Sequence, residues 1–242
     1  MLVISSNSND KIKLLKKLHD KKFRRENFVA IIEGEKFVKE AMALGVVMEV
    51  FASKSYTGSI KANFILTDPI FKEVSQEVTP QGILATVDTE GLEFKEDNVT
   101  GHFLVLEHIQ DPGNLGALIR SAAAFNFRRI YMIDCVDVFN NKTIQASAGN
   151  IFKVRYKNIK INEIPTAQNI HLIASDMKGI KLNEFRAYEG IYYGLVIGNE
   201  GQGVSTELKA RCAASVSIPM SNEVESLNAA VAGSIIMFSF YN

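Results

Sequence analysis

Three short polar motifs in the second half of the sequence carry the residues that could do chemistry. They read Asp111-Pro112-Gly113-Asn114-Leu115-Gly116 with Arg120, then Gly198-Asn199-Glu200-Gly201-Gln202-Gly203, then Ile218-Pro219-Met220 with Glu225-Ser226-Leu227-Asn228. Each motif comes where an apolar stretch typical of a strand gives way to a loop or a helix start. Because ligands in open α/β sheets bind beyond the carboxyl ends of the strands, the motifs predict one composite site.

The first motif combines turn residues with a charged group on a helix. Asp, Pro, Gly and Asn favour turns for local reasons, so residues 111–114 could be only a turn that caps the following helix. Arg120 lies two turns into an otherwise apolar helix and needs an anion or several acceptors. Both a ligand site and a structural salt bridge would meet that need.

The second motif is glycine-rich but does not match a nucleotide-phosphate loop. It fits neither G-x-G-x-x-G nor G-x-x-x-x-G-K-[ST], no lysine follows it, and Glu200 would repel a pyrophosphate. The motif therefore favours a neutral or zwitterionic ligand that the backbone approaches closely. A tight strand-to-helix loop without a ligand is the alternative.

The third motif is expected to end one strand and begin the last helix. Pro219 cannot continue the ladder of a central strand, so the chain turns there. Ser226 could cap the helix, either as a cap alone or beside free N–H groups that hold an anion. Asn228 is predicted inside an apolar helix, where a buried amide needs partners.

A basic run near the amino terminus is the other candidate binding feature. The 242 residues carry no formal net charge, which argues mildly against a nucleic-acid binder, but the charges are unevenly distributed. Among only Asp10, Asp20 and Glu26, the run holds Lys13 and the candidate RNA-binding residues Lys11, Lys16, Lys17, Lys21, Lys22, Arg24 and Arg25. Such a run is either a solvated helix face or a patch that follows phosphates.

The remaining composition indicates a cytoplasmic globular protein. Cys135 and Cys212 are the only cysteines, lie in apolar stretches, and are expected to be free thiols in a reducing compartment. The four histidines show no metal-ligand spacing, so we expect no metal. The start of the chain lacks the pattern of a signal peptide, and the apolar run 229–241 is shorter than the roughly 20 residues that span a bilayer.

The hydrophobic patterns predict two α/β domains. In the first half they indicate strands at 28–32, 46–52, 63–66 and 82–87 and helices at 10–19, 35–44 and 70–74. In the second half they indicate strands at 102–106, 129–134, 152–156, 169–175, 191–197 and 214–218 and helices at 115–126, 141–148, 206–212 and from 227. The first half is predicted as a small α/β/α layer, and the polar stretch 88–101 as a linker. The continuous apolar strand 191–197 indicates a sheet that is covered on both faces.

The order and spacing of the three motifs resemble the SpoU/TrmH family of RNA ribose 2′-O-methyltransferases, part of the SPOUT class. The resemblance implies an α/β domain with a parallel sheet and a C-terminal trefoil knot, which general topology rules would exclude. It implies S-adenosylmethionine as the cofactor, a homodimer formed through the knot, and a site to which both subunits contribute. The cofactor-binding residues that it implies are Gly198, Asn199, Gly203, Ile218, Met220 and Leu227.

The first half resembles, more loosely, the L30e-like substrate-binding domain that precedes many of these enzymes. The matching residues are Ile31-Ile32-Glu33-Gly34 and Thr79-Pro80-Gln81-Gly82-Ile83. We therefore expect an RNA substrate-binding domain at residues 1–95 and a methyltransferase domain at residues 96–242.

The resemblance predicts methyl transfer to a ribose 2′-hydroxyl in structured RNA, with rRNA favoured over tRNA as the substrate. Arg120 matches the family's proposed base, although an arginine pKa above 12 makes phosphate binding and hydroxyl orientation the safer role. Asn114, Glu200, Ser226 and Asn228 complete the predicted catalytic shell. A non-catalytic RNA-binding protein is the alternative function. A dinucleotide-dependent oxidoreductase is a third, against which the missing fingerprint counts.

Overall fold

The computed structural model describes residues 2–95, 98–221 and 223–241. The chain divides into two compact units, one of Met1–Leu92 with Phe139–Asn141 and the other of Glu93–Val138 with Lys142–Asn242. The predicted domain boundary between residues 95 and 96 touches residues 96 and 97, which lie outside the described residues. That boundary therefore stays a prediction.

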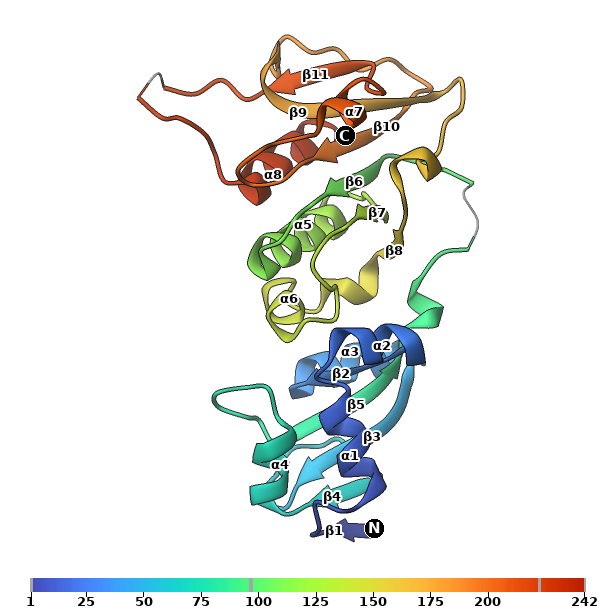
Figure 1. The fold of residues 1–242 in the computed structure, drawn as a ribbon, viewed down its shortest axis with the longest axis vertical. Coiled ribbons are helices and arrows are strands. Elements are labelled where there is room, and N and C mark those ends of the chain that lie inside the picture. Colours follow the sequence, from blue (N-terminus) through green and yellow to red (C-terminus); the bar gives the residue numbers. More distant parts are fainter. Residues whose placement is uncertain (1, 96–97, 222, 242) are drawn as a thin grey trace. The chain divides into compact units, whose positions relative to one another are not determined.

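The first unit is built on a five-stranded mixed sheet with the strand order β1-β4-β3-β5-β2 (Figure 1). Its elements are β1 (Leu2–Ile4), α1 (Asp10–Lys17), α2 (Lys21–Asn27), β2 (Val29–Glu33), α3 (Glu35–Ala43), β3 (Val47–Ser53), β4 (Phe64–Leu66), α4 (Asp68–Val74) and β5 (Ile83–Asp88). A 3₁₀ turn, η1 (Glu90–Leu92), follows β5 within the predicted linker.

The first unit has three layers, as the sequence predicts. On one face of the sheet, Ile12 and Leu15 of α1 and Phe71 of α4 share a buried cluster with alternate strand residues such as Ile31. Helix α3 buries Phe37 and Val38 and contacts β2, β3 and β5. Because strand side chains alternate between faces, both faces of the sheet are covered.

Two elements of the first unit are not among the predicted ones. Strand β1 was not expected, because Leu2 and Val3 are exposed and only Ile4 is buried, so the sequence shows no buried alternation. Helix α2 consists largely of charged residues, and its recognisable signal is local: Asp20 is the N-cap and accepts a hydrogen bond from the backbone N–H of Phe23 at 2.8 Å.

The second unit is built on a six-stranded, all-parallel sheet with the order β11-β9-β10-β6-β7-β8. Its elements are β6 (Phe103–Glu107), α5 (Pro112–Ala124), β7 (Arg129–Ile133), α6 (Asn141–Ala146), η2 (Asn150–Lys153), β8 (Arg155–Asn158), η3 (Ile161–Glu163), β9 (Ile170–Lys181), β10 (Tyr192–Ile197), α7 (Thr206–Lys209), β11 (Ala214–Ser217) and α8 (Ala229–Ser239).

The sheet of the second unit is covered on both faces, which confirms the prediction from its apolar strand. One face carries a cluster that joins Phe103 and Val105 of β6 to Val196 of β10 and Leu208 of α7. Helix α8 contacts both β10 and α5, and the latter buries Leu118 and Ile119. The side chains of residues 193–197 are all buried accordingly.

Some predicted boundaries in the second unit are wrong. The strand expected from residue 152 begins at Arg155, because Gly149 in the left-handed conformation (φ 86°) leads into the 3₁₀ turn η2. Helix α7 ends at Lys209 and does not reach Cys212. Strand β9 extends to Lys181, six residues beyond the predicted end at 175.

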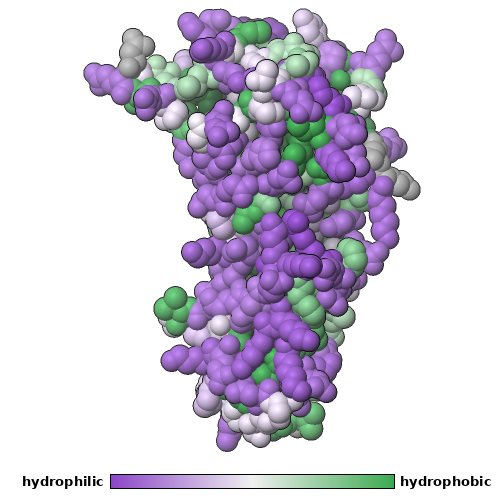
Figure 2. All heavy atoms as spheres, viewed as in Figure 1, coloured by the Kyte–Doolittle hydropathy of each residue, from purple (hydrophilic) through white to green (hydrophobic). Residues whose placement is uncertain are grey.

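The face of the molecule in Figure 2 is mostly hydrophilic, with hydrophobic side chains in separate patches. Within the described ranges, none of the helices has the length and apolar content needed to cross a membrane, and His, Cys, Asp and Glu form no group of three or more that could hold a metal ion. Cys135 and Cys212 are free thiols, and burial raises the pKa of each to about 11.

Candidate functional site

The loops that carry the three motifs lie at one edge of the parallel sheet. Strand β10 pairs with β6 on one side and with β9 on the other, and β9 pairs in turn with β11. The first motif follows β6, the second follows β10 and the third follows β11. All three therefore leave the sheet at its carboxyl edge, where the sequence predicts one site.

A pocket of about 280 Å³ opens at this edge. It is lined by every residue predicted to bind the cofactor, namely Gly198, Asn199, Gly203, Ile218, Met220 and Leu227. Glu200 and Ser226, predicted in the catalytic shell, also line it. Asn114, Arg120 and Asn228 do not, so the structure separates the predicted residues into a pocket group and an outer group.

The second motif is a closed loop that its own side chains hold in shape. The Asn199 side-chain oxygen accepts from the backbone N–H groups of Gly201 at 2.9 Å and Gln202 at 3.1 Å, and its Nδ2 donates to the carbonyl of His108 at 3.0 Å. A Cβ on Gly198 would come within 2.2 Å of the Gly203 backbone. Only glycine fits at position 198, and the backbone there stays open toward the pocket.

A chain of side-chain hydrogen bonds joins the three motifs. Asn228 Nδ2 donates to Asn114 Oδ1 at 2.8 Å, and Asn114 Nδ2 donates to Glu200 Oε1 at 3.0 Å. The residues come from motifs separated by more than 80 positions in the chain. The asparagine amides are thereby oriented, with Glu200 forming the link to the pocket wall.

Arg120 lies outside the pocket and is exposed on α5. Among the described residues, no hydrogen bond or ion pair of its guanidinium is found, so the alternative of a structural salt bridge is wrong for this chain. An exposed cation with no partner among the residues that the structure describes is available to an anionic group from outside. Arg120 lies on α5, the same helix that carries Asn114 in its first turn.

The third motif differs from its prediction in which residue caps the last helix. Asn228 is the N-cap of α8 and accepts from the backbone N–H groups of Ala230 at 2.9 Å and Val231 at 3.2 Å. The prediction that Ser226 caps the helix is wrong, as is the burial of Asn228 inside it. Asparagine and serine are both favoured at N-caps, so composition alone could not choose between them.

Glu107 is a functional candidate that the sequence reasoning missed. It ends β6, is 1% exposed, and accepts from the backbone N–H of Ser205 at 2.7 Å and from its hydroxyl at 2.6 Å. Ser205 is the N-cap of α7, and its side chain accepts from the backbone N–H of Leu208. A carboxylate at the end of an apolar strand was the available signal, because a buried charge needs partners. Glu107 holds the chain just after the second motif.

A second missed group lies on β9. Ser175, Asp176 and Met177 line the pocket together with Lys209 of α7. Lys209 Nζ and Asp176 Oδ2 are 2.5 Å apart. The backbone N–H of Lys178 and the Lys209 side chain hold the pKa of Asp176 below its usual value. No local pattern pairs these two residues, because Asp176 lies on β9 and Lys209 lies on α7.

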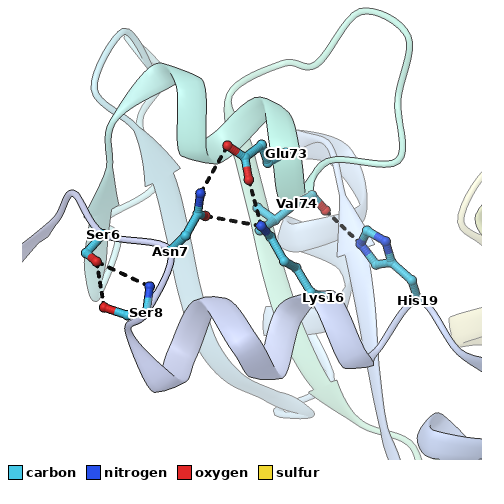
Figure 3. Close-up of polar contacts among 7 residues, drawn as sticks. All are labelled: Ser6, Asn7, Ser8, Lys16, His19, Glu73 and Val74. Carbon is cyan, nitrogen blue, oxygen red and sulfur yellow. Dashed lines mark hydrogen bonds and ion pairs between the residues drawn. The ribbon is translucent and has the colours of Figure 1, made fainter.

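The basic run is only partly available to a ligand. Figure 3 shows Lys16 directed at Glu73 and Asn7, with Nζ 2.6 Å from Glu73 Oε2. Lys11 forms an ion pair with Glu49. Arg24 is buried, and its guanidinium donates to the carbonyls of Leu18 at 2.7 Å and His19 at 2.9 Å. Glu49 and Glu73 lie outside the run, so acids beyond Asp10, Asp20 and Glu26 neutralise part of its charge.

Exposed charges of the run remain on two short helices. Lys17 lies at the end of α1, whereas Lys21, Lys22 and Arg25 lie on α2, and all four side chains are exposed. Arg24 is thus a structural residue that closes the end of α1, a correction to its predicted role. These four residues stay candidates for phosphate contacts because their side chains are exposed, and Lys22 also forms an ion pair with Glu26 at 3.8 Å.

Comparison with known proteins gives matches over both halves of the chain. A model of the SpoU rRNA Methylase family matches residues 101–238, and a model of the MRM3-like substrate binding domain matches residues 9–85. The 23S rRNA (guanosine(2553)-2'-O)-methyltransferase RlmP of Bacillus subtilis is 31% identical, covering 98% of each chain.

Two solved structures share the fold of the whole chain. A protein of the TrmH family of RNA methyltransferases from Porphyromonas gingivalis is 30% identical and has a TM-score of 0.84, over 96% of this chain and 97% of that one. An AdoMet-bound rRNA methyltransferase from Sinorhizobium meliloti has a TM-score of 0.83 at 22% identity, over 98% and 96% of the two chains.

Proposed function

This chain belongs to the SpoU rRNA methylase family, and from that premise we propose that it transfers a methyl group from S-adenosylmethionine to a ribose 2′-hydroxyl of structured RNA. One observation carries the proposal: the three motifs meet around a single pocket whose lining includes every predicted cofactor residue. The similarity to RlmP of Bacillus subtilis over the full length favours rRNA over tRNA as the substrate.

The pocket suits a cofactor that carries a positive charge, a negative charge and an apolar surface. Ile197, Val204 and Leu227 give it apolar walls, Gly198 exposes backbone, and Asp176 with Lys209 places both signs of charge at one side. S-adenosylmethionine, when bound, supplies a methyl group that its cationic sulfur has already activated. The protein must then align the hydroxyl and accept its proton, and alignment alone contributes several kcal/mol.

The outer group of residues fits the handling of the RNA. Arg120 is an exposed cation that could bind a phosphate and orient the 2′-hydroxyl, or act as base if bound RNA and neighbouring cations desolvated it. Asn114 and Asn228 present amides fixed by the hydrogen-bond chain to Glu200. Ser226 lines the pocket at the loop before α8.

Binding and product analysis on the same protein test the proposal. Calorimetry should detect S-adenosylmethionine binding and no NAD binding, which separates a methyltransferase from an oxidoreductase. Mapping of methylated riboses in cellular rRNA and tRNA, with and without the protein, should show one rRNA position that depends on it. Cofactor binding without any dependent ribose would contradict the substrate assignment, and NAD binding would contradict the reaction.

We further propose a homodimer that uses the last helix, together with the family's trefoil knot. Val231, Ile235 and Phe238 are exposed at helical spacing on α8, and Tyr241 follows them. Helix α8 also returns from the edge strand β11 to pack on α5 and β10, as threading of the chain end would require.

An apolar stripe of this kind predicts a dimer at micromolar concentration. Sedimentation velocity should therefore give about twice the monomer mass, and the double substitution of Val231 and Phe238 by Glu should give monomers. A parent protein that sediments as an active monomer would contradict the dimer.

The exposed part of the basic run is expected to bind RNA. Replacing Lys17, Lys21 and Lys22 by Gln should weaken RNA affinity and flatten its salt dependence, since each lost phosphate contact removes roughly 0.7–0.9 from the slope of log affinity against log salt. RNA binding across a salt series measures both effects.

The matched control is the pair Lys54→Gln and Lys61→Gln, which removes exposed lysines of the same unit outside the run. It should leave the slope unchanged. Equal affinities and parallel lines for parent and triple variant would show that the run is only a solvated face.

A further inference from the structure

One wall of the pocket contains an irregularity in the pairing of strand β9 with strand β11. Consecutive residues Ser215 and Val216 of β11 pair with Ala174 and Ile180 of β9, so residues 175–179 leave the ladder between them. A Cβ on Gly179 would lie 2.4 Å from the Ser215 backbone, and the Ser217 hydroxyl donates to the Gly179 carbonyl at 2.9 Å. Residues 175–179, named the excursion below, are therefore held against β11 at Gly179.

Asp176 is the acidic residue of this excursion, and its carboxylate is held by two groups. Oδ1 accepts from the backbone N–H of Lys178 at 3.0 Å, and Oδ2 lies 2.5 Å from Lys209 Nζ. A carboxylate has about four lone-pair positions, so these contacts leave acceptor capacity on a residue that lines the pocket. The Lys209 ammonium neutralises the charge without using all of that capacity.

We propose that Asp176 binds the ribose hydroxyls of the cofactor's adenosyl group, an inference that rests on the proposed function. The transferred methyl must lie at the β6 and β10 side, where Glu200 contacts Asn114. Asp176 lies at the β9 and β11 side, beside Ile218 and Met220, whose apolar and backbone groups suit a flat neutral base. The sugar attached to that base then falls next to the carboxylate.

The alternative ligand for Asp176 is the ammonium of the cofactor's amino-acid half. A carboxylate already paired with a lysine attracts a second cation weakly, because the charges of the pair largely cancel. It still accepts hydrogen bonds from neutral donors, and a vicinal diol offers two of them. Asp176 therefore acts as a specificity residue for the ribose.

Calorimetry with cofactor fragments separates these possibilities. The probes are S-adenosylhomocysteine, 5′-methylthioadenosine, which lacks the amino-acid half, and the 2′-deoxy and 3′-deoxy forms of the latter. Asp176→Asn should weaken binding of the first two by the same factor, about 10- to 100-fold, the loss expected for hydrogen bonds to a charged acceptor. It should change binding of the deoxy forms less.

Matched variants keep the result interpretable. Glu184→Gln removes another acid paired with a lysine, Lys181, outside the pocket, and should change nothing. Lys209→Met retains the Asp176 carboxylate, so this variant should still bind 5′-methylthioadenosine more tightly than the deoxy forms. The measurement tests the proposal even if Asp176→Asn fails to fold. Loss of that preference in Lys209→Met would overturn the assignment.

Each of the other possible outcomes would contradict the assignment of Asp176. If Asp176→Asn weakens S-adenosylhomocysteine but not 5′-methylthioadenosine, the carboxylate binds the amino-acid half and the proposal is wrong. If it weakens neither, Asp176 does not contact the cofactor. In both cases the proposed function survives, whereas a parent protein that binds none of the adenosyl probes overturns the function and this inference together.

Discussion

Arg120→Ala should reduce methyl transfer by about 10²- to 10⁴-fold, the range typical for loss of a general base or an equivalent group. The guanidinium is exposed on α5, and no partner for it is found among the described residues, so its removal exposes no buried group. Cofactor affinity should stay within a few-fold of the parent, because Arg120 does not line the pocket. Single-turnover methylation and calorimetry of S-adenosylhomocysteine measure the two quantities separately.

Two further variants give the Arg120 result its meaning. Arg155→Ala removes another exposed arginine of the same unit and should leave the rate unchanged. Arg120→Lys keeps the positive charge, so a partly restored rate would favour phosphate binding over proton removal by the guanidinium. An Arg120→Ala enzyme that turns over RNA within a few-fold of the parent would remove Arg120 from the catalytic residues.

Glu107→Ala should lower the free energy of unfolding by about 2–4 kcal/mol, because two half-buried donors lose a buried, charged acceptor. Those donors are the backbone N–H and the hydroxyl of Ser205, both within 2.7 Å of the carboxylate. The chain around Ser205 directly follows Gly203 and Val204 of the pocket wall, so cofactor affinity should also fall. Urea unfolding and calorimetry give the two values.

Glu107→Gln is the conservative companion, since it keeps the volume and one acceptor oxygen. Its unfolding free energy should fall between those of the parent and Glu107→Ala. Glu207→Ala, an exposed acid on the neighbouring helix α7, should change stability by no more than about 0.5 kcal/mol. Unchanged stability and affinity in Glu107→Ala would show that Ser205 finds another acceptor and that the buried carboxylate does not support the pocket.

The sequence by itself determined the family, the two α/β halves and the residues of the second and third motifs that line the pocket. These follow from local signals, because apolar runs bounded by Gly, Pro and Asn define strands and loops in sequence order. The second motif shows how far such signals reach: Gly198 and Asn199 shape their own loop through contacts a few residues away. Residues of this kind can be identified without knowledge of what else lies near them.

Only the tertiary structure decided what the polar residues do, because their partners are distant in the chain. Asn228 caps α8 and also reaches Asn114, so the cap could not be assigned by choosing between two good capping residues. In the basic run, Lys16 forms an ion pair with Glu73, which lies 57 positions away in the chain.

The same reason hid Glu107 and Asp176, whose partners Ser205 and Lys209 come from other elements of the sheet unit. The role of a charged residue near a site cannot be assigned until the fold shows which opposite charge or hydrogen-bond donor contacts it. Contacts between elements that lie far apart in the chain, which no local pattern encodes, therefore decided which charges are structural and which are left for the ligand.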